Sequence, residues 1–249
     1  MRALRILLIL VVVLGGLFVA ADRVAVGFAE GKAADELRSN ENLSEKPEVS
    51  IEGFPFLTQV VGGQLDDVEI KIKEYEASAG GATGGGAGTL RIQDLDARMQ
   101  GVRFSNGYTS ATADSATGTA HVSYAELLRA AQVEPVEVAP GATAKVIRLS
   151  DGGNGKMKVT VEATVLGRKL PDPITVTSSM RVEGDVVKVH ADNLPSFGGV
   201  PTPESTVRQI TDFQQSITGL PAGIKIDKVE PAPDGVHITV AGSHVSLVG

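Results

Sequence analysis

The chain has 249 residues, a formal net charge of −7, no cysteine, no tryptophan and only 4% aromatic residues. The missing cysteines exclude a disulfide framework and thiol catalysis, and the acidic charge makes nucleic acid a poor candidate for a partner. Scarce aromatic rings argue against a carbohydrate-binding module, and any contact with anionic lipid must be local because net charge does not attract the chain to it.

Residues 1–21 have the pattern of a secretory signal peptide or an N-terminal membrane anchor. Two arginines precede an uncharged apolar run, Ile6–Ala21, which the charged pair Asp22-Arg23 ends. The run is slightly shorter than the ~20 residues of a typical transmembrane helix, and small residues at its end offer a cleavage point. We favour cleavage and keep the anchor as the alternative. Either one places residues 22–249 outside the cytoplasmic membrane, as a single domain or a closely joined pair.

The first part of that region predicts one helix followed by strands. Residues 22–40 carry apolar side chains at three- and four-residue spacing, which is typical of an amphipathic helix. Strands are predicted at Glu48–Ile51, Val68–Lys73 and Thr89–Phe104. Between the last two, the glycine-rich tract Gly80–Gly88 lacks the lysine and the strand-to-helix context of a phosphate loop, so it predicts a flexible hairpin loop.

A short helix and a β-meander follow. Ser123-Tyr124-Ala125-Glu126 is a capping-box pattern that opens a helix over Tyr124–Gln132. Loops at 151–155 and 183–185 favour two antiparallel hairpins, whose strands are Ala144–Leu149, Met157–Leu166, Ile174–Val182 and Val186–Val189.

The C-terminal part predicts a second helix and a last hairpin. A Pro/Gly-rich connection at 195–203 leads into a helix over 203–218, with Phe213 in its apolar stripe. Strands at Ile224–Val229 and Val236–Val245 then flank the turn Pro233-Asp234-Gly235.

An apolar cluster between glycines, Gly53–Gly63, has two interpretations. Its phenylalanines and aliphatic residues either pack in the core, as most such side chains do, or handle apolar ligands. Leu220-Pro221 repeats the pattern near the C-terminus. The candidate lipid-contacting residues are Phe54, Phe56, Leu57, Val60, Val61, Phe213 and Leu220.

Catalytic, metal and cofactor sites have little support in the sequence. His190 and Asp192 share a predicted strand face, as do His237 and Thr239, but zinc needs three or four converging ligands. The acidic pairs Asp66-Asp67 and Asp94/Asp96 resemble glycosidase carboxylates only if the fold places them opposite each other. We therefore predict no catalytic residue, no metal site and no cofactor.

Three motifs carry a family resemblance. They are Gly53-Phe54-Pro55-Phe56-Leu57-Thr58-Gln59 with Gly62-Gly63 and Val68-Glu69-Ile70, then Ser123-Tyr124-Ala125-Glu126-Leu127-Leu128, and last Leu220–Ile226 with Asp234–Gly242. In this order they resemble the LmeA-like phospholipid-binding family of actinobacterial envelope proteins, over roughly residues 22–249. The first and last motifs are fairly specific together, whereas each alone is weak.

The resemblance implies a non-enzymatic, extracytoplasmic protein whose partners are phospholipids such as phosphatidylinositol and the membrane surface. It also implies an α+β fold in which a strongly curved antiparallel sheet wraps around one or two long amphipathic helices, like tubular lipid-binding domains. Such a protein shuttles lipid or presents it for envelope glycolipid assembly. The alternatives are a scaffold protein of the envelope with a dry core and, less favoured, a hydrolase of envelope glycans or lipids.

Overall fold

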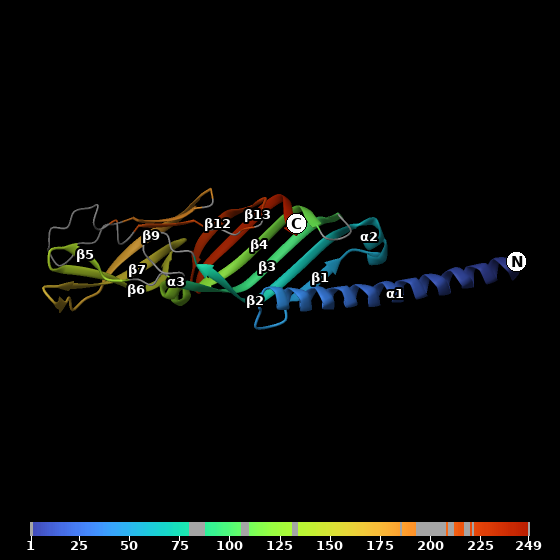
Figure 1. The fold of residues 1–249 in the computed structure, drawn as a ribbon, viewed down its shortest axis with the longest axis horizontal. Helices are drawn as coiled ribbons and strands as arrows, with labels where there is room; N and C mark the ends of the chain where they lie inside the picture. Colours follow the sequence, from blue (N-terminus) through green and yellow to red (C-terminus); the bar gives the residue numbers. More distant parts are fainter. Residues whose placement is uncertain are drawn as a thin grey trace.

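The computed structural model describes residues 2–79, 88–105, 110–130, 134–184, 186–192, 208, 212–216, 220 and 222–248. The molecule is elongated: two antiparallel sheets follow one another along its length, and a long N-terminal helix projects beyond the first sheet (Figure 1). One sheet curls into a half-barrel. The predicted α+β class, with a strongly curved antiparallel sheet and a long helix, is confirmed.

The long helix α1, Arg2–Asn40, joins the apolar run and the predicted 22–40 helix without a break. Among the described residues it is the one helix long and apolar enough to cross a membrane, and a signal sequence passes the same test. Its large apolar side chains from Leu4 to Val19 are exposed, whereas Val26 and Ala34 are buried against the body of the molecule. Only the second half of α1 is therefore packed.

Sheet A is six-stranded, in the order β1-β2-β3-β4-β13-β12. Its strands are β1 Glu48–Glu52, β2 Gln64–Ala79, β3 Gly88–Ser105, β4 Ser110–Ser123, β12 Ile224–Ala232 and β13 Gly235–Val248. They contain the strands predicted in this part of the chain, mostly with longer bounds, and β4 in addition. Residues 80–87 of the predicted glycine-rich loop lie outside the described residues.

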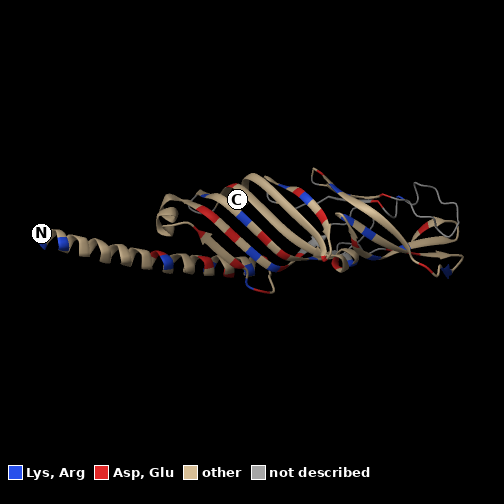
Figure 2. Ribbon diagram, turned by 180° about the vertical axis from the view of Figure 1, so that it is seen from behind, with Lys and Arg blue, Asp and Glu red and all other residues tan. Residues whose placement is uncertain are grey.

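The two faces of sheet A differ in polarity because successive side chains of a strand point to opposite faces. In one row across the sheet, Ile70 pairs with Ala97, Ala97 with Gly118, and Gly118 with Val240. In the neighbouring row of the other face, Lys71 pairs with Asp96 and forms an ion pair with it at 4.0 Å. Charged residues form stripes across the strands of this sheet (Figure 2). We name these faces the apolar face and the polar face.

Sheet B is seven-stranded, in the order β11-β10-β9-β7-β6-β5, with β8 paired to β7. Its strands are β5 Val136–Ala139, β6 Ala142–Gly153, β7 Lys156–Val165, β8 Arg168–Lys169, β9 Ile174–Glu183, β10 Val186–Ala191 and β11 Phe213–Ser216. The two predicted hairpins are confirmed. The loop expected at 151–155 is shorter, because Gly153 already pairs with Lys156 across an Asn154-Gly155 turn.

The helix predicted over 203–218 is wrong at Phe213–Ser216, which forms strand β11 beside β10. The amide of Asp212 does bond to the carbonyl of Arg208 at 2.8 Å, as in a helical turn, immediately before this strand. The exposed edge of β10 offers unpaired backbone groups, and β11 satisfies them. This tertiary pairing outweighs the helical spacing of the apolar residues. The remainder of 203–218 and the 195–203 connection lie largely outside the described residues.

The structure confirms the first hydrogen bond of the predicted capping box. The amide of Glu126 donates to the Ser123 hydroxyl at 3.3 Å and opens α3, Tyr124–Ala130. The Tyr124 hydroxyl donates to the carbonyl of Ala232 at 2.8 Å, and burial raises its pKa to about 12. Helix α3 is thereby fastened to sheet A where sheet B begins.

Two apolar clusters fill the interior. The first joins sheet B with α3 and with β12 and β13, and its members include Met157, Val161 and Val236. The second joins the opposite end of sheet A to α1, and includes Leu65 and Val26. The apolar face of sheet A extends between the two clusters.

Candidate lipid-binding site

The apolar segment around Phe54 contains a short helix that the sequence did not predict, α2, Phe56–Gly62. Pro55 stands at its N-cap and offers no capping side chain. The carboxylate of Asp22 on α1 replaces this cap, because its Oδ1 accepts the amide of Leu57 at 2.8 Å. Asp22 is fully buried. Helix α2 is therefore attached to the residue that follows the apolar run of α1.

Arg23 strengthens the same junction. Its Nη2 forms a salt bridge to Asp22 Oδ2 at 2.9 Å, and its guanidinium lies 5.3 Å from the centre of the Phe54 ring. A guanidinium at this distance from an aromatic face is attracted to it. The charged pair that ends the apolar run thus holds both α2 and the phenylalanine before it.

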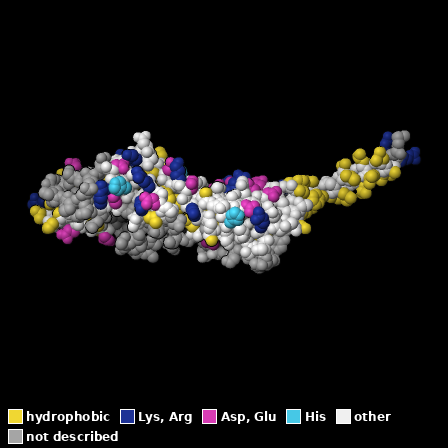
Figure 3. All heavy atoms as spheres, turned by 90° about the horizontal axis from the view of Figure 1, so that it is seen from above, with side chains coloured by type: hydrophobic (Ala, Val, Ile, Leu, Met, Phe, Trp, Pro, Cys, Tyr) yellow, Lys and Arg dark blue, Asp and Glu magenta, His cyan; other side chains and the backbone are white. Residues whose placement is uncertain are grey.

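This junction carries apolar side chains that are largely exposed in the described structure. Phe54 is 57% exposed and Val61 is 87% exposed, while Val24 and Phe28 lie on the outer side of α1 and are also exposed. Figure 3 shows that hydrophobic side chains on the projecting helix continue down to the body of the molecule. We name Val24, Phe28, Phe54 and Val61 the α2 end.

The seven predicted lipid-contacting residues do not form one site. Phe56 is buried in the cluster beneath α2, and Leu57 and Val60 pack against the same cluster. Leu220 packs against the other cluster, next to sheet B. Phe213 is in β11, and its side chain lies outside the described residues. The structure therefore divides the predicted set between the α2 end, the core beneath it and sheet B.

The sequence interpretation missed the middle of the apolar face. Ile70, Ala97, Gly118 and Val240 lie in one row and are only partly buried, with Ile70 packed against one buried cluster and Val240 against the other. The alternation around Ile70 was visible in the sequence. The small residues Ala97 and Gly118 gave no signal, because their place beside Ile70 depends on the pairing of strands far apart in the chain.

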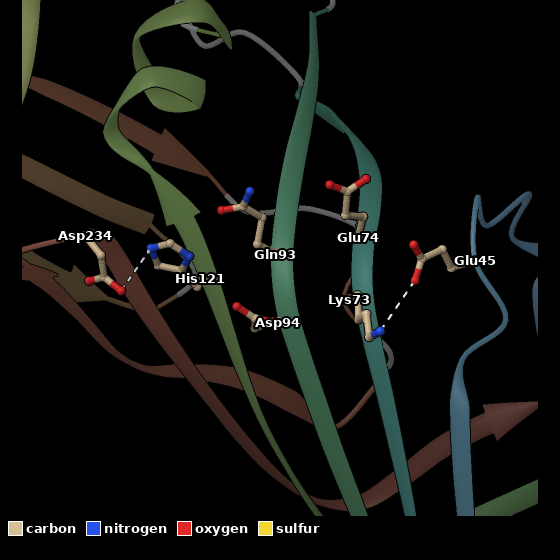
Figure 4. A pocket seen from close by; sticks show the side chains of 7 residues that line it. All are labelled: Glu45, Lys73, Glu74, Gln93, Asp94, His121 and Asp234. Atoms are coloured by element: carbon tan, nitrogen blue, oxygen red, sulfur yellow. Dashed lines mark ion pairs between the residues drawn. The ribbon is translucent and has the colours of Figure 1, made fainter.

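A shallow polar hollow of about 410 Å³ lies near the β12–β13 turn (Figure 4). Its lining residues are Glu45, Lys73, Glu74, Gln93, Asp94, His121 and Asp234. The cationic Lys73 already faces Glu45, at 3.7 Å. With four acidic side chains around it, this hollow disfavours the phosphate of a lipid headgroup and favours a cation.

Two histidines and a carboxylate meet at one side of this hollow, where His121 and Asp234 form part of its lining. The Nε2 atom of His237 lies 3.1 Å from Asp234 Oδ1, and the Nε2 atom of His121 lies 3.6 Å from Asp234 Oδ2. The hydrogen bond with His237 holds the pKa of Asp234 below its usual value. His237 and Thr239 do share a face of β13, as predicted, but the side chains that His237 meets are those of Asp234 and His121.

His190 and Asp192 do not converge on a common site, because each forms an ion pair with a different residue. His190 Nδ1 lies 2.7 Å from Asp212, whereas Asp192 is held by Lys156 at 2.9 Å. Lys156 lowers the pKa of Asp192 by donating a hydrogen bond to its carboxylate. His190 and Asp192 are thus not a shared ligand pair in the described part of the chain.

The acidic pairs also lack the opposed arrangement that a glycosidase needs. Asp67 pairs in register with Gln100 and binds Arg98 through both carboxylate oxygens, and Asp96 pairs with Lys71 further along the sheet. Asp94 lines the polar hollow. No described contact sets Asp66-Asp67 against Asp94 or Asp96.

The fold and the site define a class: a β-rich domain with a partly open apolar sheet face, joined to a helix that could cross a membrane. The chain belongs to the LmeA-like phospholipid-binding family, whose model matches residues 20–241. This match confirms the resemblance found in the sequence motifs and supports phospholipid binding. The family is a lipid-binding family and not an enzyme family. Neither the curated proteins nor the solved structures gave a match.

Proposed function

We propose that this chain is a non-enzymatic phospholipid-binding protein at the outer face of the cytoplasmic membrane. Lipid enters or leaves at the α2 end, and its acyl chains lie along the apolar face of sheet A. The protein shuttles lipid or presents it for the assembly of envelope glycolipids, with phosphatidylinositol among its ligands. The family match over residues 20–241 spans both sheets, which supports one lipid-binding unit over residues 22–249.

The contact between Asp22 and the amide of Leu57 carries this proposal. Residues 4–21 would span about 27 Å as a helix, close to the ~30 Å hydrocarbon core of a bilayer. If this run is retained as an anchor, Asp22 stands at the membrane surface and brings α2 there with it. The exposed rings and aliphatic side chains of the α2 end then meet the lipid interface.

The apolar face supplies the surface for the acyl chains. Its central row is partly exposed, and Ala97 and Gly118 present only small side chains there, with Val240 packed close over Gly118. Each methylene group that moves from water to such a surface contributes ~0.8 kcal/mol. Contact with a few methylene groups is therefore enough for useful affinity, without a charged pocket for the headgroup.

The test fills the apolar face and measures retained lipid. The full chain, purified in detergent, is weighed by native mass spectrometry as wild type, as Ala97→Trp and as Thr117→Trp. Ala97 lies on the apolar face, while Thr117 is exposed in the next row, on the polar face. We expect wild type and Thr117→Trp to retain one phospholipid, and Ala97→Trp to lose most of it.

Both outcomes of this comparison are informative. The N-terminal helix is unchanged in the three proteins, so lipid bound around it should not differ, and only lipid on the apolar face should respond to Ala97→Trp. Equal retention by the two variants, or no retained phospholipid in wild type, contradicts the proposal. The same spectra report whether residues 1–21 are present in protein taken from membranes, which decides between the anchor and the cleaved signal.

A further inference from the structure

His121, Asp234 and His237 form a cluster that lipid binding does not use. His121 on β4 pairs directly with His237 on β13, and Asp234 lies in the turn that begins β13. One ligand atom from each of the three residues lies within 4.8 Å of the others. The imidazole rings are 5.0 Å apart, and both Nε2 atoms are directed at the same carboxylate.

The position of His121 gives a second observation. Its Nε2 atom is buried and has no hydrogen-bond partner among the described residues. The ring packs closely against the backbone of Gly235, because a Cβ added there would lie 2.6 Å from this atom. The same Cβ would also clash with the carbonyl oxygen of Val122, at 2.3 Å, so the close approach of the two strands requires glycine at position 235 as well.

The donor set suits a borderline divalent metal. Two imidazole nitrogens and one carboxylate oxygen are common ligands of zinc, whereas calcium and magnesium take oxygen ligands. Zinc bonds of about 2.0–2.1 Å would place donor atoms about 3.3 Å apart, so the longest separation in the present cluster, at most 4.8 Å, needs to shorten by up to about 1.5 Å. Acidic side chains of the neighbouring hollow, Asp94 and Glu74, lower the local potential and favour a cation.

We propose that His121, Asp234 and His237 bind a zinc ion at the junction of β4 with the β12–β13 hairpin. Three protein ligands leave a coordination position for water or for an anionic group. The ion links the turn before β13 to β4, and β4 and β13 are already paired in register by backbone hydrogen bonds. This proposal is independent of where lipid binds, because the cluster lies outside the apolar face.

The test is a zinc titration of the full chain in detergent, after removal of metals with a chelator. Isothermal titration calorimetry compares wild type with His237→Gln and Asp234→Asn, and the probe is zinc chloride alone. Both side chains are exposed, so these variants are expected to fold. We expect one zinc per chain in wild type and affinity at least ~10-fold lower in each variant, which corresponds to about 1.4 kcal/mol.

His190→Gln is the matched control, because the His190 side chain is 56% exposed, like the 52% of His237, and it also pairs with an aspartate. It should bind zinc as wild type does. Cobalt added instead of zinc gives a visible absorption band that reports nitrogen and oxygen ligands, and His237→Gln should change it. The proposal is overturned if wild type binds no zinc, if His190→Gln and His237→Gln weaken binding equally, or if magnesium competes as well as zinc.

Discussion

A single carboxylate on α1 decides how the apolar run of this helix meets the folded domain. Asp22 is buried, and a buried carboxylate persists only when its oxygens have partners. One oxygen caps α2 through Leu57, and the other binds Arg23. The N-terminal amides of a helix carry partial positive charge, so an anion here is favourable as well as geometrically required.

Changing Asp22 should therefore loosen α2 specifically. We expect Asp22→Ala to increase the hydrogen-exchange rate of the Leu57 amide by about tenfold, because this amide loses its acceptor. Asp22→Asn keeps an acceptor oxygen and should have a smaller effect. Asp35→Ala on the same helix removes only an exposed ion pair with Lys46 and serves as the control. Unchanged exchange at Leu57 in Asp22→Ala would show that α2 is held by its apolar contacts alone.

At the scale of elements, the sequence predicts the strands whose pattern is local, and it fails at turns and at strand edges that pair with distant segments. Alternating strands such as Val68–Lys73 were predicted because their pattern is local. The sequence predicts a longer loop at 151–155, whereas the structure has a tight turn at Asn154-Gly155, where both residues have the positive φ that such a hairpin turn requires. Strand β11 was missed because its pairing with β10 joins segments distant in sequence.

The candidate site was predictable only in part for the same reason. The apolar segment around Phe54 is visible in the composition of the sequence, but the cap of its helix comes from Asp22, 35 positions before Leu57. The His121–His237 pair depends on the register of β4 against β13, which no local pattern reveals. Family motifs thus predicted phospholipid binding, whereas the positions of the candidate site residues come only from the structure.

The β12–β13 hairpin gives a prediction about packing within sheet A. A Cβ added at Gly242 would lie 2.3 Å from the carbonyl oxygen of Gly223, which belongs to the backbone and cannot rotate away. We expect Gly242→Ala to lower the free energy of unfolding by about 1–3 kcal/mol, measured by urea denaturation in detergent.

Gly62→Ala is the control for that measurement, because nothing lies within 4 Å of a Cβ at this helical position. It should leave the free energy of unfolding unchanged or raise it by up to ~1 kcal/mol, since alanine is favoured over glycine in a helix. A Gly242→Ala protein as stable as wild type would mean that β12 can shift away from β13 at little cost.

At the scale of the whole molecule, the elongated shape orders the parts along one direction. The apolar run of α1 projects from one end, the α2 end lies where it meets the body, and sheet B lies at the opposite end (Figure 1). The histidine cluster is beside α3, between these extremes. If the apolar run spans the membrane, sheet A stands next to the bilayer and sheet B extends away from it.

The absence of tryptophan allows a direct test of this orientation. Phe54→Trp places a unique fluorophore at the α2 end, and Leu166→Trp places one in the β7–β8 turn of sheet B, where the residue is 82% exposed. In vesicles that contain brominated phospholipid, the full-length Phe54→Trp protein should be strongly quenched, because the ring lies at the lipid interface. Leu166→Trp should be quenched little, as its ring is in water far from the bilayer.

A second substitution, Val61→Asp, made in the Phe54→Trp protein, should reduce the quenching of the tryptophan at position 54, because a charge there opposes contact with lipid. Equal quenching of the two tryptophans would contradict the orientation and would require the molecule to lie flat on the membrane.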